Sequence, residues 1–240
     1  MKKLFNPSRK NLFAVGGLLV AAALFASCKK DNDVNTEIPA AGVMAFNLAP
    51  DKPGVIVSLG GNSLTNVPLN YTSFTGVYQR AFPGTRLVES IDASTGTPFA
   101  STSQNFEVNK YYSVFAMGTN GTYRNVVVED ELDSLPSTTG NAYLRFVNAV
   151  PDSGSSTVKI TSGATTVDAN SNYGQVSAFT GFAPGNVTLA VNNEGNVNAS
   201  RTFPVEKDKV YTVLLVGVPG SNDSTKAVQI KYITNGTITP

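Results

Sequence analysis

The fold of this chain is decided by a run that occurs twice, as MAFNLAPD at residues 44–51 and as LRFVNAVPD at residues 144–152. In both copies large apolar residues alternate with smaller or polar ones, and a period of two predicts a strand with one buried face. The Pro-Asp pair that closes each copy predicts a turn. We align Phe46 with Phe146 and place one inserted residue in the second copy.

Two further landmarks repeat in the same order. The Pro-Gly pairs at residues 83–84 and 184–185 predict type II turns that each join two strands, because proline presets φ and glycine tolerates positive φ. Tyr112 and Tyr211 each open a strand after a short polar corner, which resembles the tyrosine corner of immunoglobulin-like sandwiches. Together with the opening run, these landmarks indicate an internal duplication.

The composition fits this architecture, since 41% of the residues are hydrophobic and only 15% are charged, with glycine, asparagine and proline between short runs of strand formers. We predict an all-β protein with two tandem immunoglobulin-like antiparallel β-sandwich domains. A charged segment rich in turn residues follows the apolar run that ends near residue 128. From this segment we predict domain 1 at residues 41–133, a linker at residues 134–140 and domain 2 at residues 141–240.

The amino-terminal segment predicts export. Four basic residues precede residue 12, and the next fifteen residues carry no charge, which is shorter than the roughly 20 that a membrane-spanning helix needs. Cys28, the single cysteine, follows Ala26-Ser27 and resembles the lipidation site of bacterial lipoproteins. We predict a cleaved signal at residues 1–27, a lipidated Cys28, and a flexible tether within residues 28–40.

The tether carries a further localisation signal. Its first residues, KKDND at 29–33, resemble the charged segment that follows the lipid cysteine in surface-exposed lipoproteins. This predicts a protein held by its lipid at the outer membrane and exposed at the cell surface, although a plain solvated tether fits the same residues. The Asp-Ser-Leu and Asp-Ser-Thr triplets at Ser134 and Ser224 resemble bacterial O-glycosylation acceptors.

Charge and residue usage exclude several functions. Without the signal, the chain has 14 basic and 17 acidic residues and no basic cluster. We therefore expect no nucleic acid partner. The chain has no histidine, which removes imidazole bases and the usual zinc ligands. No nucleotide-binding or nucleophile motif occurs, so we predict no catalytic residues, no cofactor and no enzyme activity.

Carboxylates remain as candidate site residues. The densest acidic group consists of Glu129, Asp130, Glu131 and Asp133. Such oxygens suit calcium, but their position between the domains favours a solvated linker, and we predict no metal site. Asp51 and Asp152 end the two copies of the opening run, where aspartate commonly accepts hydrogen bonds from nearby backbone amides, so we interpret both as turn formers.

Aromatic residues are the other candidates. Tyrosine offers both a ring face and a hydroxyl to a sugar, so candidate ligand contacts are Tyr71, Tyr78, Tyr123 and Tyr173. The chain has no tryptophan, and we favour packing over sugar binding for these rings.

The second copy resembles a known bacterial family, the domain of unknown function 4397. The resemblance lies in RFVNAVPD at residues 145–152 and in NVTL at residues 186–189, which follows a Pro-Gly turn; the first copy matches more loosely. The resemblance implies an all-β fold and a location outside the cytoplasm, and it implies no established activity.

These observations lead to three functional hypotheses. The first is a non-enzymatic, lipid-anchored cell-envelope protein with a structural, adhesion or partner-binding role toward a protein or glycan at the cell surface. The second is a glycan-binding lipoprotein of a nutrient-uptake system. The third, a carboxylate-dependent hydrolase, requires two acids facing each other across a cleft.

Overall fold

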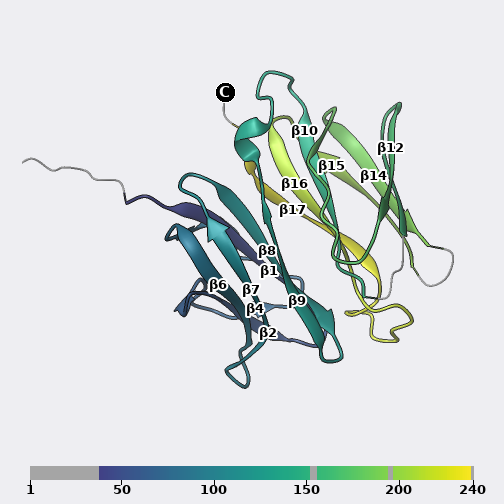
Figure 1. Cartoon of the computed structure of the whole chain (residues 1–240). Helices are drawn as coiled ribbons and strands as arrows, with labels where there is room; N and C mark the ends of the chain where they lie inside the picture. Colours follow the sequence, from purple (N-terminus) through teal and green to yellow (C-terminus); the bar gives the residue numbers. More distant parts are fainter. Residues whose placement is uncertain (1–37, 152–155, 194–196, 239–240) are drawn as a thin grey trace, which may run out of the picture. The chain divides into compact units, whose positions relative to one another are not determined.

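Strands account for almost all of the regular structure, as the composition predicts. The computed structural model describes residues 38–151, 156–193 and 197–238 (Figure 1). The predicted signal, Cys28 and Asp152 lie outside the described residues. Within the described part, no helix is long and apolar enough to cross a membrane.

The first sandwich, which we call domain 1, is built from nine strands. They are β1 (Ala41–Leu48), β2 (Gly54–Leu59), β3 (Asn62–Ser63), β4 (Leu69–Asn70), β5 (Gln79–Ala81), β6 (Gly84–Asp92), β7 (Thr97–Phe106), β8 (Tyr111–Thr119) and β9 (Thr122–Glu129). The sheet that contacts domain 2, which we call the inner sheet, has the strand order β5-β1-β8-β9. The outer sheet has the order β3-β2-β6-β7, with β4 beside β2.

The second sandwich, domain 2, follows a short 3-10 helix, η1 (Leu132–Ser134). Its strands are β10 (Ala142–Asn148), β11 (Ser156–Ser162), β12 (Thr165–Ser171), β13 (Thr180–Phe182), β14 (Gly185–Asn192), β15 (Asn198–Val205), β16 (Lys209–Val216) and β17 (Gln229–Thr237). The inner sheet has the order β13-β10-β16-β17, and the outer sheet has the order β12-β11-β14-β15. The predicted all-β class with tandem sandwiches is therefore confirmed.

Each inner sheet contains one parallel pairing. β1 runs parallel to β8, and β10 runs parallel to β16, whereas their other neighbours in the inner sheets are antiparallel. Parallel neighbours need a long crossover, and here the outer-sheet strands of each domain supply it. The purely local alternation in the sequence did not reveal this pairing.

The central strands of the inner sheets, β1, β8, β10 and β16, are buried on both of their faces. In β1, Val43 and Ala45 pack in the core of domain 1, whereas Met44 and Phe46 pack against residues of domain 2. The expectation of a strand with one buried face is therefore wrong for β1, because the second domain covers the face that a lone sandwich would leave in water. The four sheets pack as successive layers in the order outer, inner, inner, outer (Figure 1).

The two copies of the opening run differ in register by one residue from the alignment based on their phenylalanines. Phe46 forms a bridge with Phe74, and Val147 forms the equivalent bridge with Val176, so Phe46 corresponds to Val147. Phe46 and Val147 both lie between the domains, whereas Phe146 lies in the core of domain 2. The expected correspondence of Phe46 with Phe146 is therefore wrong. The true correspondence is shifted by one residue, and such a shift moves a side chain to the opposite face of a strand.

The tyrosine corners are present in both domains. The amide of Glu107 donates a hydrogen bond of 3.1 Å to the hydroxyl of Tyr112, and the amide of Glu206 donates one of 3.0 Å to the hydroxyl of Tyr211. Each bond fixes the corner that leads into the central strand of an inner sheet, which confirms this prediction.

The two Pro-Gly pairs also take the same position in both domains. Gly84 and Gly185 have φ of 99° and 135°, a region that favours glycine. Each glycine begins an outer-sheet strand directly after a short inner-sheet strand, β5 or β13. The pairs therefore join two strands as predicted, and they carry the chain from one layer of the sandwich to the other. The φ of 135° at Gly185 is far from the roughly 80° of a type II turn, so the predicted turn type is wrong for the second pair.

We predict that Tyr211→Phe lowers the free energy of unfolding by about 1 kcal/mol, because the Glu206 amide loses its acceptor. Chemical denaturation of the purified protein measures this change. Tyr232→Phe is the matched control, since Tyr232 packs beside the same core and no hydrogen bond of its hydroxyl is found among the described residues. Equal stability of the wild type and Tyr211→Phe would contradict a structural role for the corner.

Candidate functional site

The two inner sheets meet through an apolar cluster that we call the junction. Its fully buried members are Met44, Phe46, Leu48, Phe115 and Met117 from domain 1, and Val147, Ala149, Leu214 and Val216 from domain 2. The ring of Phe46 stacks on the rings of Phe115 and Phe74, with centroids 4.7 and 5.5 Å apart. Full burial of a phenylalanine, leucine, methionine or valine side chain contributes about 1.5–3 kcal/mol to the free energy of folding. Because the junction fully buries nine apolar residues, it resembles the interior of a domain.

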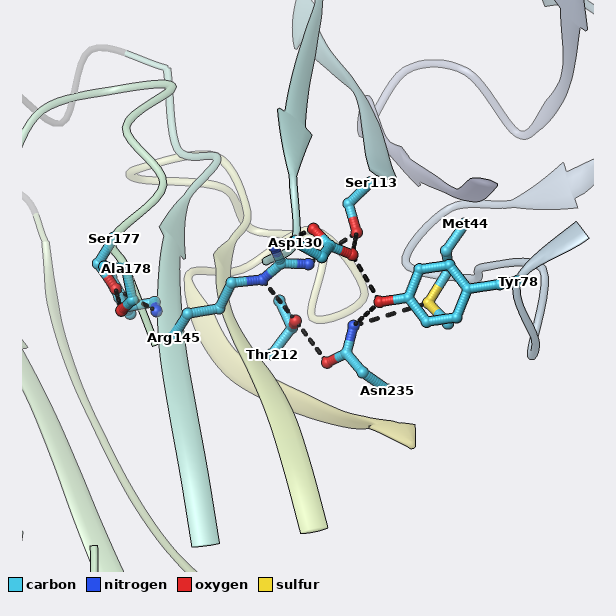
Figure 2. Close-up of polar contacts among 10 residues, drawn as sticks. Met44, Tyr78, Ser113, Asp130, Arg145, Ser177, Ala178, Thr212 and Asn235 are labelled. Carbon is cyan, nitrogen blue, oxygen red and sulfur yellow. Dashed lines mark hydrogen bonds and ion pairs between the residues drawn. The ribbon is translucent and has the colours of Figure 1, made fainter. Parts of the chain in front are cut away.

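A buried ion pair crosses the junction between Arg145 on β10 and Asp130, the residue that follows β9 (Figure 2). The Arg145 side chain is 2% exposed and that of Asp130 is 0% exposed. The Nε of Arg145 donates to Thr212 Oγ1 at 2.9 Å, and Nη2 donates to Ser113 Oγ at 2.7 Å. The guanidinium therefore has partners in both domains.

The carboxylate of Asp130 accepts hydrogen bonds from three side chains. Besides the guanidinium of Arg145, the hydroxyl of Tyr78 donates to Oδ2 at 2.5 Å and the hydroxyl of Ser113 donates to Oδ2 at 2.7 Å. Burial, together with the negative charge of Asp130, raises the pKa of Tyr78 above its ordinary value. Tyr78 is therefore a protonated donor at neutral pH.

Two aromatic rings flank the guanidinium. The Cζ of Arg145 lies 4.7 Å from the ring centroid of Phe179 in domain 2 and 5.5 Å from that of Phe115 in domain 1. A cation over the face of an aromatic ring is attracted to it, and the attraction is stronger where water is excluded. The charge of Arg145 is thus compensated by Asp130 and by both rings.

The polar residues of the junction are arranged with approximate two-fold symmetry. Tyr112 pairs with Glu129 and Tyr211 pairs with Thr234, so the residues that follow, Asp130 and Asn235, are equivalent. By the same argument Met44, which pairs with Ser113, is equivalent to Arg145, which pairs with Thr212. We call the hydrogen-bonded side chains at the junction the polar cluster. Its members are Ser113, Asp130 and Tyr78 from domain 1, and Arg145, Thr212 and Asn235 from domain 2.

The two halves of this cluster carry different chemistry. In one half Arg145 donates to Asp130; in the other, Nδ2 of Asn235 lies 3.8 Å from the sulfur of Met44 and 3.4 Å from the Tyr78 hydroxyl (Figure 2). Thr212 donates to Oδ1 of Asn235 at 2.7 Å, as Ser113 donates to Asp130. One half is charged and the other is neutral, in an interface of the type that two-fold dimers form.

The acidic group at residues 129–133 is not simply a solvated linker. Asp130 is buried in the junction, and this part of the expectation is wrong because its partner Arg145 lies on a different sheet. Glu129 and Asp133 instead lie 3.3 and 2.8 Å from the ammonium of Lys110, which lowers the pKa of Asp133. Within the described residues, no group of three or more potential ligands could hold a metal ion.

The four candidate tyrosines do not form one exposed platform. Tyr71, Tyr78 and Tyr173 pack against the junction, where burial raises the pKa of Tyr71 to about 12. Tyr123 lies on β9, where its ring meets the edge of Phe99 at a centroid distance of 4.9 Å. Each of the four rings therefore has packing contacts, and a ligand-binding role for any of them stays a prediction.

Asp51 holds a distant hairpin rather than its own turn. Its Oδ2 accepts from the amide of Asn120 at 2.9 Å and from the hydroxyl of Tyr123 at 2.6 Å, both in the β8–β9 hairpin. The local turn is fixed by Asn47, whose Oδ1 accepts from the Ala49 amide at 3.1 Å. The interpretation of Asp51 as a local turn former is wrong, since the buried asparagine before it has that role.

Asn148 repeats the role of Asn47 in domain 2. Its Oδ1 accepts from the Val150 amide at 3.1 Å, and its Nδ2 donates to the carbonyl of Ser171 at 3.0 Å. The signal was present in the sequence, since both copies of the opening run carry an asparagine before the Pro-Asp pair.

The two candidate glycosylation sites are exposed. Ser134 ends η1, and its hydroxyl donates to the Glu131 carbonyl at 2.7 Å. Ser224 lies in the loop between β16 and β17. Modification of either serine stays a prediction.

Comparison with known families bears on the duplication directly. The family described as domain of unknown function DUF4397 matches residues 41–159 and again residues 142–235. The chain belongs to the DUF4397 family. The two matches confirm the tandem resemblance, and they overlap only where domain 2 begins. No curated protein matches the chain.

The two DUF4397 domains allow a sharp test of the junction. Arg145→Met leaves Asp130 buried without its cation, and we expect the free energy of unfolding to fall by about 3–5 kcal/mol. Adding Asp130→Asn gives the charged half the Met-Asn chemistry of the neutral half, and we expect most of the loss to be recovered. Denaturation of both single variants and of the double variant measures the coupling.

The single variant Asp130→Asn is the matched control, because it leaves Arg145 as the unpaired charge and should also destabilise the protein. Additive losses in the double variant would show that the ion pair does not couple the two domains.

Proposed function

We propose that this chain is a non-enzymatic, lipid-anchored protein of the cell envelope, in which two joined DUF4397 sandwiches act as one rigid partner-binding or adhesion module. The observation that carries this proposal is the junction, where an ion pair and an apolar cluster are buried between the domains. Moving one domain against the other would expose both, at a cost of several kcal/mol.

The proposed cellular location of the module is inferred from the sequence. An export signal at residues 1–27 and the lone Cys28 support anchoring by covalent lipid, and several acyl chains hold a protein to a membrane firmly. The charged run at residues 29–33 supports display at the outer surface of the cell. A rigid pair of domains on a lipid anchor suits presentation of a binding surface to a protein or glycan.

Acidic side chains beside the junction already interact with other residues of the protein, which supports a non-enzymatic role. A cavity of about 280 Å³ beside the junction is lined by Glu129, Asp130 and Glu131. Asp130 accepts three hydrogen bonds and Glu129 lies beside Lys110, so two of these three acids already have ion-pair partners. A hydrolase needs a carboxylate available to a substrate or water.

A glycan-binding lipoprotein is the second candidate, and a groove of about 560 Å³ at the edge of the junction favours it. Among the residues that line the groove are Asn70, Tyr71, Thr72, Gln229 and Lys231. Amide and hydroxyl groups beside a tyrosine are suited to the hydroxyls of a sugar. Saturable binding on a glycan array that is lost in Gln229→Ala would favour this candidate.

The anchoring proposal is tested by protease treatment of intact cells that express the full-length chain. We expect the protein to fractionate with membranes and a single fragment with both domains to be released, because the junction protects the segment between them. Cys28→Ala should leave the protein outside the membrane fraction. Protection of the wild type from protease would contradict surface display, and equal fractionation of both forms would contradict lipid anchoring.

A further inference from the structure

A cationic pocket of about 250 Å³ lies at one end of domain 1. Its lining consists of Leu59, Asn62, Ser63, Leu64, Arg80, Ala81, Phe82 and Arg86. Two of these residues are arginines, four are apolar, and none is acidic. Phe82 stands at the rim with 63% of its surface exposed, which is unusual for a phenylalanine.

In domain 2 a phenylalanine fills the equivalent place. Ala81 pairs with Ala41 in the inner sheet, and Phe182 pairs with Ala142 at the equivalent position. Phe182 is one of the largest fully buried side chains in the described residues and belongs to the core of domain 2. An alanine in place of this ring leaves space at the end of domain 1.

The same comparison places a charge where domain 2 has an apolar residue. Arg86 and Val187 are each the second residue after the glycine that begins an outer-sheet strand. Val187 is fully buried in the core of domain 2. On β6, Arg86 shares a face with Val88, two residues further on, which is buried in the core of domain 1.

Arg86 is incompletely satisfied by the protein. Its Nη2 donates to the Pro83 carbonyl at 3.1 Å, but its Nε is buried and has no hydrogen-bond partner among the described residues. A buried donor without an acceptor costs free energy, and a guanidinium presents its donors in a fork that matches a carboxylate. The nearest acid along β6, Glu89, is on the opposite face and accepts from Ser58 at 3.3 Å.

We propose that this pocket binds a carboxylate group carried on an apolar body, with the carboxylate at Arg86 and the apolar part against Leu59, Leu64 and Phe82. The lining has only two uncharged polar side chains, Asn62 and Ser63, which is too few for the many hydroxyls of a sugar ring. The volume admits a group the size of one amino acid residue. The C-terminal residue of a peptide, with an apolar side chain and a free carboxylate, has this chemistry.

The inference deepens the partner-binding role and rests on it, because it assigns a chemical class to a ligand of the module. The two can fail separately. Protease treatment of cells tests anchoring and display, whereas the pocket is tested on purified protein.

The test is calorimetric titration of the full-length lipidated protein in detergent with N-acetyl-leucine, with empty micelles as the blank. We expect saturable binding of N-acetyl-leucine, at least tenfold weaker binding of N-acetyl-glycine because it lacks the apolar body, and no binding of N-acetyl-leucinamide because it lacks the charge. Glucuronate is included as the sugar acid and should bind at least tenfold more weakly.

Two variants locate the site. Ala81→Phe fills the pocket as Phe182 fills the end of domain 2, and Arg86→Met keeps an apolar stem but removes the fork; each should weaken binding at least tenfold. Lys207→Met, at an exposed lysine of domain 2, removes the same charge elsewhere and should bind like the wild type. Thermal unfolding of each variant checks that it is folded.

Any one of the following results would overturn the proposal. They are an absence of saturable binding to the wild type, equal binding of the acid and its amide, and binding that is unchanged in both folded pocket variants. Tighter binding of glucuronate than of N-acetyl-leucine would likewise overturn it in favour of a sugar acid.

Discussion

The rest of the structure depends on the buried contact between the two inner sheets, with the Arg145–Asp130 ion pair at its polar centre. Removing a guanidinium and a carboxylate from water costs several kcal/mol for each group, and their attraction offsets this only when the remaining donors and acceptors are also satisfied. Here Ser113, Thr212 and Tyr78 supply those partners. The pair therefore requires strands from both domains to be in place at once, which makes the junction specific as well as apolar.

Duplication explains how such a contact arose on equivalent faces. The same strand face of each domain meets the other with approximate two-fold symmetry, so each contact in one half has an equivalent contact in the other half. Met44 and Arg145 occupy one pair of equivalent positions, and Asp130 and Asn235 occupy another. Complementary charge in one half only is possible because the two halves are encoded separately in one chain, whereas a dimer of identical domains would have to carry both charges twice.

The sequence predicted the features that depend on local backbone chemistry. The tyrosine corners at Tyr112 and Tyr211 and the positive φ of Gly84 and Gly185 each depend on a few neighbouring residues. The sequence did not predict the burial of Asp130, because its partner lies in another sheet and a charged run between domains resembles a linker. Nor could alternation alone show which face of β1 meets the core, since both faces are buried and Phe46 and Phe146 look equivalent until pairing fixes the register.

The differences between the two copies are more informative about function than their similarities. Shared positions such as Asn47 and Asn148 fix the same turn in both domains, so their retention is explained by folding alone. Domain 1 has Ala81 where domain 2 buries a phenylalanine, and Arg86 where domain 2 buries a valine. Relative to domain 2, these two residues bury less apolar surface and leave a guanidinium donor without an acceptor among the described residues, and both differences oppose the stability of domain 1. They also coincide at one end of one sandwich, where together they create a pocket with a positive charge inside it. A carboxylate ligand would compensate both losses at once, by filling the space of the missing ring and by accepting from the guanidinium.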